Sequence, residues 1–527
     1  MYPMNKIKIA SISAVILVLL SCNEDWLEVT PSDRLSEASF YQNEDHATRA
    51  ITACYDPLKH PRAFSLFFYF YFDTFSDRAL HEQINLNNMI VSPTDGNIYG
   101  MYLKMYKGIF RCNLALEKII GLKGNPGIEM NQELKDRFIG EAKFLRALYY
   151  YYATKIFRYP PLIKETIDDL DVQLTNASQE DLFAFMEEDL IDAISRLPAT
   201  YNDANLGRAT KGAAHTMLGK VYLYQHKFQQ ARDQFLAVKE LGVYEIIMPQ
   251  GTSKYDYLYA YQCNFTGDDL ITPSGNRYVA ENNKESVFEI QYALGGWEIW
   301  EGGWQADGQL RTLFFGPEGY RNMVPTRAFA EAFEKAPADH PAGLEYDPRK
   351  YVTLYQPGDT IFYVQNKKPP VRWRDRIHTN ASITQGYGWG KHFKPTFFDE
   401  SSNLNNDYNN VRLFRYADVL LLLAEAEYLV NGSTPLALEA VNMVRARTGL
   451  PLLTEVTPEA IIHERDVELG YETKRYWDLV RWSKYPTPWV DITDLMPNYN
   501  PVRAGYMPMP MNEINLSRGA LRQNPGY

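Results

Sequence analysis

The chain has 527 residues, a formal net charge of −11 and 14% aromatic residues, with 38 tyrosines among them. This acidic balance disfavours a nucleic-acid partner, because phosphates require a basic surface. Beyond residue 22 the cysteines are Cys54, Cys112 and Cys263, which are odd in number and lack CxxC spacing. We therefore expect buried free thiols, not a disulfide framework or a zinc site. So many tyrosines also predict a wide amphipathic surface in addition to a large core.

Residues 1–21 predict a lipoprotein signal peptide. Two lysines precede the apolar run IASISAVILVLL at 9–20, which is too short to span a bilayer, and the sequence LLSC ends it at Cys22. We expect Cys22 to become the first residue of the mature chain and to carry a lipid that anchors the protein without spanning the membrane. The alternative is an ordinary secretory signal with a chance cysteine.

Residues 23–25, Asn-Glu-Asp, follow that cysteine directly. They resemble the surface-export signal of Bacteroidetes-type lipoproteins, so we expect the protein on the outside of the outer membrane. Removing residues 1–21 removes two lysines and no acidic residue, which leaves 52 basic and 65 acidic residues and a net charge of −13. No later segment is apolar enough to span a membrane.

Helical periodicity dominates the first half of the chain. Residues 101–120 and 131–158 form long uninterrupted patterns. The second pattern is apolar nearly all round, which predicts a buried helix, and Pro160 and Pro161 end it.

The segment 215–238, HTMLGKVYLYQHKFQQARDQFLAV, matches the tetratricopeptide pattern in spacing and in residue type. Gly219 is small where two antiparallel helices must approach, and Phe235 fills the space between helix pairs. A second, degenerate pair is predicted at 416–449, with Thr434 as N-cap, Pro435 at the first helical position and Gly449 at the end. Such pairs need stacked neighbours, so we expect one superhelical scaffold with a large insertion between the two units.

The intervening segment, about 244–412, has a different character. ESVFEIQY at 285–292 alternates apolar and polar residues and predicts a strand, while Gly, Pro, Asn and aromatic residues surround it without helical period. The expected fold is mostly α, a tetratricopeptide-like scaffold with a loop-rich, partly β insertion that forms the ligand-binding face. The expected regions are 1–21, 22–243, 244–412 and 413–527, the last three making one compact unit.

Taken together, these segments resemble the SusD/RagB family of nutrient-binding outer-membrane lipoproteins. The resemblance covers nearly the whole chain and rests on the lipobox, EAKFLRALYYYYATKIFRYPPLI, LGKVYLYQHKFQQA, SVFEIQY, VRLFRYADVLLLLAEAEYLV, VNMVRARTGL, IHERDVELGYETKRYWDLVRW and the terminal MPMPMNEI and QNPGY. It implies a surface lid on a SusC-like TonB-dependent transporter that binds oligosaccharides, or in some members peptides, and performs no chemistry. It implies no cofactor and leaves structural calcium open.

The sequence carries no catalytic signature. His463 and Glu464 begin a metalloprotease-like pattern, but position 467 is valine, so we expect a solvated helix whose charges alternate with core residues. A pair of carboxylates that meets in space and hydrolyses a glycan stays open as an alternative function.

Sugars present flat C–H faces and hydroxyl rims, which proteins bind with aromatic rings and with amide, carboxylate or guanidinium groups. Trp297, Trp300 and Trp304 in GGWEIWEGGW are the first candidates, and the alternative is that they anchor a loop to the scaffold. Tyr387 and Trp389 in GYGWG are further candidates, and the alternative is a turn that leads into KHFKP.

A second group of candidates lies near residue 100. The resemblance implies that the loop DGNIYGMYLKMY contributes to a sugar site, which makes Asn97, Tyr99 and Tyr102 candidates, although Tyr102 could simply pack. In FSLFFYFYFDTFSDRAL the density of Phe predicts packing, and Asp77 and Arg78 at its polar end are the candidates for hydroxyl contacts.

Overall fold

The computed structural model describes residues 40–123, 126–169, 171–293, 308–316, 320–356, 360–361, 371–372, 386–392 and 408–527. Within these residues one hydrophobic core contains side chains of the helical scaffold and of the segment between 244 and 412, such as Phe288 and Leu413. Cys54, Cys112 and Cys263 are buried and free, which confirms the prediction for all three. No helix in the described residues is long and apolar enough to cross a membrane.

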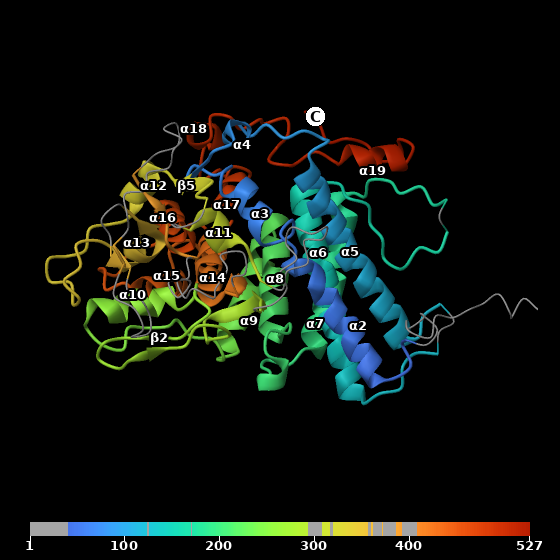
Figure 1. The fold of residues 1–527 in the computed structure, drawn as a ribbon, viewed down its shortest axis with the longest axis horizontal. Helices are drawn as coiled ribbons and strands as arrows, with labels where there is room; N and C mark the ends of the chain where they lie inside the picture. Colours follow the sequence, from blue (N-terminus) through green and yellow to red (C-terminus); the bar gives the residue numbers. More distant parts are fainter. Residues whose placement is uncertain are drawn as a thin grey trace, which may run out of the picture.

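A row of long antiparallel helices forms the scaffold (Figure 1). Each member contacts the next in the order α2 Glu44–Lys59, α5 Gly96–Ile120, α6 Gln132–Phe157, α7 Gln179–Arg196, α8 Lys211–Tyr224, α9 Phe228–Glu240, α14 Tyr416–Asn431 and α15 Pro435–Ala446. The helix pair α8–α9 therefore packs directly against α14–α15, although the whole insertion separates them in sequence. This arrangement confirms the predicted single scaffold.

Local sequence signals set the ends of these helices. The Asn131 side chain accepts hydrogen bonds from the Glu133 and Leu134 amides at the start of α6, and α6 ends shortly before the two prolines. Thr434 caps α15 as predicted, with Pro435 at the first position. Gly449 lies three residues beyond the last helical residue and has a left-handed φ of 71°.

Gly219 lies where α8 meets α9 most closely. A Cβ at this position would lie 2.6 Å from a ring carbon of Phe235, so only glycine fits without a shift. The tetratricopeptide-like spacing thus has the physical cause that the sequence predicted, a close approach of two helices.

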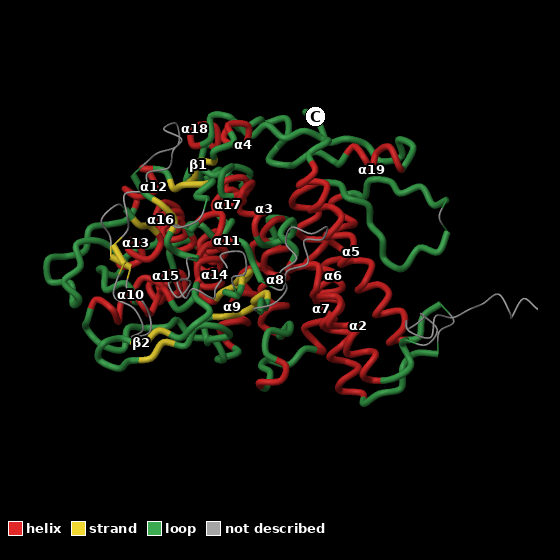
Figure 2. Tube along the Cα trace, in the orientation of Figure 1, coloured by secondary structure: helices red, strands yellow, loops and turns green. Residues whose placement is uncertain are grey.

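The remaining helices are short (Figure 2). They are α3 Leu66–Phe72, α4 Ile84–Asn87, α10 Lys254–Gln262, α11 Arg311–Phe315, α12 Arg327–Ala332, α13 Pro348–Thr353, α16 Pro458–Leu469, α17 Arg475–Trp482, α18 Ile492–Leu495 and α19 Met511–Leu516, with a 3₁₀ turn at Asp203–Asn205. The strands form antiparallel pairs: β1 Ala79–His81 with β5 Met323–Pro325, β2 Leu270–Ile271 with β3 Arg277–Tyr278, β4 Ser286–Ile290 with β10 Val411–Arg415, β6 Leu354–Tyr355 with β9 Gly388–Trp389, and β7 Thr360–Ile361 with β8 Val371–Arg372.

The pair β4–β10 joins the insertion to the scaffold. β4 confirms the strand predicted at 285–292, and its partner β10 continues directly into α14. The predicted polar face of β4 is not solvated, however, because Glu289 is buried and its Oε1 lies 2.9 Å from Nε of Arg412. The strand is therefore covered on both faces.

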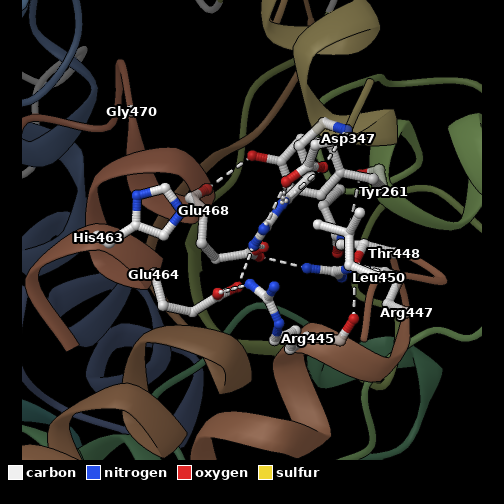
Figure 3. Close-up of polar contacts among 12 residues, drawn as sticks. Tyr261, Asp347, Arg445, Arg447, Thr448, Leu450, His463, Glu464, Glu468 and Gly470 are labelled. Atoms are coloured by element: carbon white, nitrogen blue, oxygen red, sulfur yellow. Dashed lines mark hydrogen bonds and ion pairs between the residues drawn. The ribbon is translucent and has the colours of Figure 1, made fainter. Parts of the chain in front are cut away.

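The prediction of a solvated helix around His463 was wrong for its acidic residues. Glu464 and Glu468 of α16 are buried in a network of guanidinium groups (Figure 3). Arg349 Nη1 lies 3.0 Å from Glu468 Oε2 and also pairs with Glu464, while Arg447 contacts Glu468 from the end of α15. Burial alone would raise the pKa of Glu468, but the nearby arginines outweigh it and hold that pKa well below the usual value. The charged residues of α16 therefore led to a wrong prediction of solvent exposure for a helix that is largely buried.

Candidate ligand-binding site

Two segments that are far apart in sequence, α3 and residues 311–320, bring aromatic side chains together near the start of α5. The ring of Phe67 in α3 lies 5.8 Å from that of Phe70, Phe70 lies 5.7 Å from Phe314 of α11, and Phe314 lies 5.4 Å from Tyr320. Phe70 is buried beneath the others, Phe67 and Phe314 are half-buried, and Tyr320 is 56% exposed. The edge-to-face contacts hold these rings as one rigid layer.

A polar pair adjoins this layer. Arg62 Nε donates a hydrogen bond to Asn97 Oδ1 over 3.2 Å, and the Arg62 guanidinium lies 5.9 Å from the centre of the Phe67 ring. The two side chains meet because Gly100 leaves space: a Cβ there would lie 2.1 Å from Cδ of Arg62. We call Arg62, Phe67, Asn97, Phe314 and Tyr320 the aromatic rim.

The start of α5 is fixed in its position by Asp95. Its Oδ1 accepts hydrogen bonds from the Asn97 and Ile98 amides, and its Oδ2 accepts one from the Tyr71 hydroxyl over 2.8 Å. Asn97 is therefore presented on a capped helix terminus, not on a free loop. Apolar ring faces beside a guanidinium and an amide form a combination that suits a polyhydroxylated ligand.

Comparisons with known protein families identify the chain. A family model described as the SusD family matches residues 284–527, and a second, described as starch-binding and associating with the outer membrane, matches residues 25–223. Together the two models account for most of the chain. The chain belongs to the SusD family.

Individual SusD-family relatives agree over nearly the full length. A SusD-like protein of Formosa agariphila is 25% identical over 505 residues, which cover 91% of this chain and 93% of the relative. The crystal structure of a SusD-like protein from Bacteroides fragilis has a TM-score of 0.72 at 25% identity and covers 94% of this chain and 100% of its own. A solved structure described as a laminarin-binding SusD-like protein has a TM-score of 0.70 at 24% identity. The match covers 92% of this chain and 100% of the solved chain.

The residues predicted near position 100 have different environments in this SusD-family fold. Asn97 belongs to the aromatic rim, and Tyr99 is half-buried beside Asn512 and Glu513 of α19, where burial and then the Glu513 carboxylate raise its pKa. Tyr102 is only 3% exposed and packs its ring against Tyr106 and Phe157 at 4.5 and 5.3 Å. Its ring is therefore packed in the core, in agreement with the alternative prediction that Tyr102 packs and does not contact a ligand.

Asp77 and Arg78 are both engaged in ion pairs with the C-terminal helices. Asp77 accepts two hydrogen bonds of 3.0 Å from Arg475, and Arg78 donates hydrogen bonds of 3.1 and 2.6 Å to Asp466. The Arg78 guanidinium also lies 6.0 Å from the ring centre of Phe329. These side chains connect α3 and β1 to α16 and α17, and a ligand contact from either would have to compete with these bonds.

Tyr387 and Trp389 lie at β9, whose partner is β6. Trp389 is 2% exposed and stacks on Tyr471 with the ring centres 4.2 Å apart and the planes 9° apart, while Tyr387 is half-buried against the core. Trp297, Trp300 and Trp304, and Cys22 as the predicted lipidation site, lie outside the described residues. Ligand binding by the predicted residues therefore stays a prediction, with Asn97 as the member that adjoins exposed aromatic surface.

Sequence reasoning missed Arg62, Phe67, Phe314 and Tyr320. One signal was available for Tyr320, because GPEGYRN places a tyrosine among turn residues much as the tryptophans of 297–304 lie among glycines. Phe67 could not be separated from the packed phenylalanines around it, since all but one of the α3 side chains are buried.

A concavity away from the aromatic rim lies between α2, the turn at 204–208 and the end of β4. It encloses about 720 Å³ and is lined in part by Thr52, Asp56, Arg208 and Gln291. Its polar groups are largely engaged, since Arg208 Nη1 donates to Glu141 Oε2 over 2.9 Å and Arg208 Nη2 to Thr52 Oγ1 over 3.3 Å. No group of three or more His, Cys, Asp or Glu side chains suited to a metal ion occurs in the described part of the chain.

Proposed function

We propose that this SusD-family protein is a non-catalytic glycan-binding protein of the cell surface, which captures oligosaccharides at the aromatic rim. The observation that carries the proposal is the layer of Phe67, Phe314 and Tyr320, joined through the buried ring of Phe70, beside the Arg62–Asn97 hydrogen bond. The starch-binding description of one matching family model and the laminarin-binding relative support a glycan as the ligand. The tryptophans at 297, 300 and 304, which lie outside the described residues, stay predicted ligand contacts on the sequence pattern alone.

The proposal includes an anchor and a partner. Cys22 carries the lipid that holds the protein at the outer membrane, and the captured oligosaccharide passes to a SusC-like TonB-dependent transporter. The lipobox and the family support both points. Replacing Cys22 with Ala should release the protein from the membrane fraction, and affinity purification of the intact lipoprotein from its own membranes should recover a TonB-dependent barrel.

Binding of purified residues 23–527 to a glycan panel, followed by isothermal titration calorimetry, tests the ligand. Tyr320→Ala and the triple Trp297→Ala, Trp300→Ala, Trp304→Ala variant should weaken binding, by about tenfold for each stacking ring lost. Phe110→Ala is the matched control, because Phe110 is 52% exposed but lies several turns farther along α5. Unchanged affinity in Tyr320→Ala, with intact circular dichroism, would show that the rim is not the site, and unchanged affinity in the triple variant would remove the three tryptophans from it.

Two other functions have distinct outcomes in the same assays. An oligopeptide carrier of the RagB type would bind peptides and ignore the glycan panel. A surface glycan hydrolase would release products from a polysaccharide, and one carboxylate substitution would abolish that release.

A further inference from the structure

A small cavity in the middle of the scaffold has an unusual lining. It encloses about 20 Å³ and lies among side chains of α6, α8, α14, α16 and α17. Its charged lining residues are five cations and one carboxylate, namely Lys155, Lys220, Arg465, Lys474, Arg481 and Asp478. Buried charge of one sign is costly unless a counter-charge is near.

The carboxylates within reach are already shared among three of these cations. Asp418 lies 2.8 Å from Lys220 Nζ and 3.0 Å from Arg465, and Asp478 lies 2.8 Å from Arg465 and 2.9 Å from Arg481. Arg481 also pairs with Glu425. Three acidic side chains thus balance three basic ones, and Lys155 and Lys474 are left over.

Neither remaining lysine forms an ion pair within 4.0 Å among the described residues, although Asp478 attracts Lys155 from farther away. Lys474 Nζ donates to the Leu413 carbonyl over 2.8 Å. Lys155 Nζ is surrounded by rings instead, 4.5 Å from the centre of Trp477 and 5.3 Å from those of Tyr151 and Tyr224. Burial and then the charges of Lys220 and Lys474 lower the pKa of Lys155 well below its usual value. Cation–π contacts offset only part of such a cost.

Two further polar atoms at this cavity have no hydrogen-bond partner in the described structure. They are the Trp477 indole Nε1 and the Tyr224 hydroxyl oxygen, both fully buried. Indole N–H only donates, and an ammonium group only donates, so the unsatisfied groups here are chiefly donors. A water molecule needs acceptors for its own two protons, whereas an anion needs donors alone.

We propose that this cavity binds a small monovalent anion of halide size, with Lys155, Tyr224 and Trp477 as its ligands. The volume has room for about one water-sized particle, which excludes sulfate or a carboxylated sugar. The anion supplies the negative charge that Lys155 lacks and accepts the hydrogen bonds that Trp477 and Tyr224 leave unused. Lys155 and Tyr224 are half-buried, and no residue that lines the cavity belongs to the aromatic rim, so the site is independent of glycan binding there.

Thermal unfolding of residues 23–527 at fixed pH and ionic strength tests this site, with sodium chloride exchanged for sodium gluconate, whose anion is too large for the cavity. Chloride should raise Tm saturably, by about 2 °C at a hundredfold excess over its dissociation constant. Lys155→Met should abolish this dependence. Lys143→Met is the matched control on the same helix, because Lys143 pairs with Asp192 at 2.9 Å, and it should keep the dependence.

An equal chloride effect in the parent and in Lys155→Met would overturn the proposal, since it would reflect a general salt effect. Crystals of the parent protein soaked in bromide give a second measurement that does not require a variant to fold. An anomalous peak among Lys155, Tyr224 and Trp477 is expected. Bromide peaks elsewhere with none in this cavity, or an ordered water at that position, would refute the anion site.

Discussion

Arg62 can reach Asn97 because residue 100 has no side chain. We expect Gly100→Ala to displace Arg62, since the new Cβ would lie 2.1 Å from its Cδ. Arg62 is flexible, so the fold should survive, while glycan affinity should fall by about tenfold through loss of one hydrogen bond from a charged group. Calorimetric titration measures this, with Gly96→Ala as the control because no atom lies within 4 Å of a Cβ at Gly96. Equal affinity in both variants would remove Arg62 from the site.

Asp73 makes the stability depend on pH. Burial raises its pKa from 3.8 to about 8, although the Thr473 amide donates to Oδ1, and Oδ2 has no partner among the described residues. The folded state therefore binds a proton that the unfolded state releases, and the stability from this group falls as pH rises from about 4 to about 8, by up to about 1.4 kcal/mol per pH unit. Asp73→Asn should remove that slope in urea unfolding at several pH values, and an unchanged slope would contradict the assignment.

At the scale of elements, Gly219 sets the distance between α8 and α9. Gly219→Ala gains about 1 kcal/mol of helix propensity but places a methyl group 2.6 Å from Phe235, and overpacking costs about 1–3 kcal/mol. We expect net destabilisation in chemical denaturation. Adding Phe235→Leu should make the Gly219→Ala change less costly, and a purely additive double variant would show that the two side chains do not conflict.

Helices and strands could be predicted from the sequence where the residues that cause them lie close together in the chain. The α5, α6, α8, α9, α14 and α15 helices follow from periodicity, caps and small residues that recur within a turn or two. Most strands in the described residues have two or three residues, and some exist only because a distant segment pairs with them, as β1 does with β5. The aromatic rim was hidden for the same reason, since Arg62 meets Asn97, and Phe70 of α3 meets Phe314 of α11, only after folding.

Across the whole molecule, the arginine–glutamate network joins the insertion to the C-terminal helices. Glu468→Gln would leave Arg349 and Arg415 short of a counter-charge, and we expect a loss of about 3–5 kcal/mol. The pKa of Glu468 is lowered, so its contribution is present above about pH 4 and disappears as the pH falls further. Acid and urea unfolding of this variant would measure both effects.

Glu455→Gln provides the control, because Glu455 is exposed in the same C-terminal region. If Glu468→Gln were no less stable than Glu455→Gln, the network would not join the two parts. The sequence pattern could not reveal this network, since burial of acidic residues depends on arginines from 349, 415 and 447, which no local spacing connects.

The contact of α9 with α14 also determines the order in which the molecule can be completed. α9 ends at Glu240 and α14 begins at Tyr416. The face of α9 that α14 covers therefore stays uncovered until the C-terminal quarter of the chain has been synthesised. Contacts at such sequence separation form late and slow folding. A chain whose synthesis is incomplete therefore carries an open apolar face on α9, and this face is covered only when α14 packs against it in the last stage of folding.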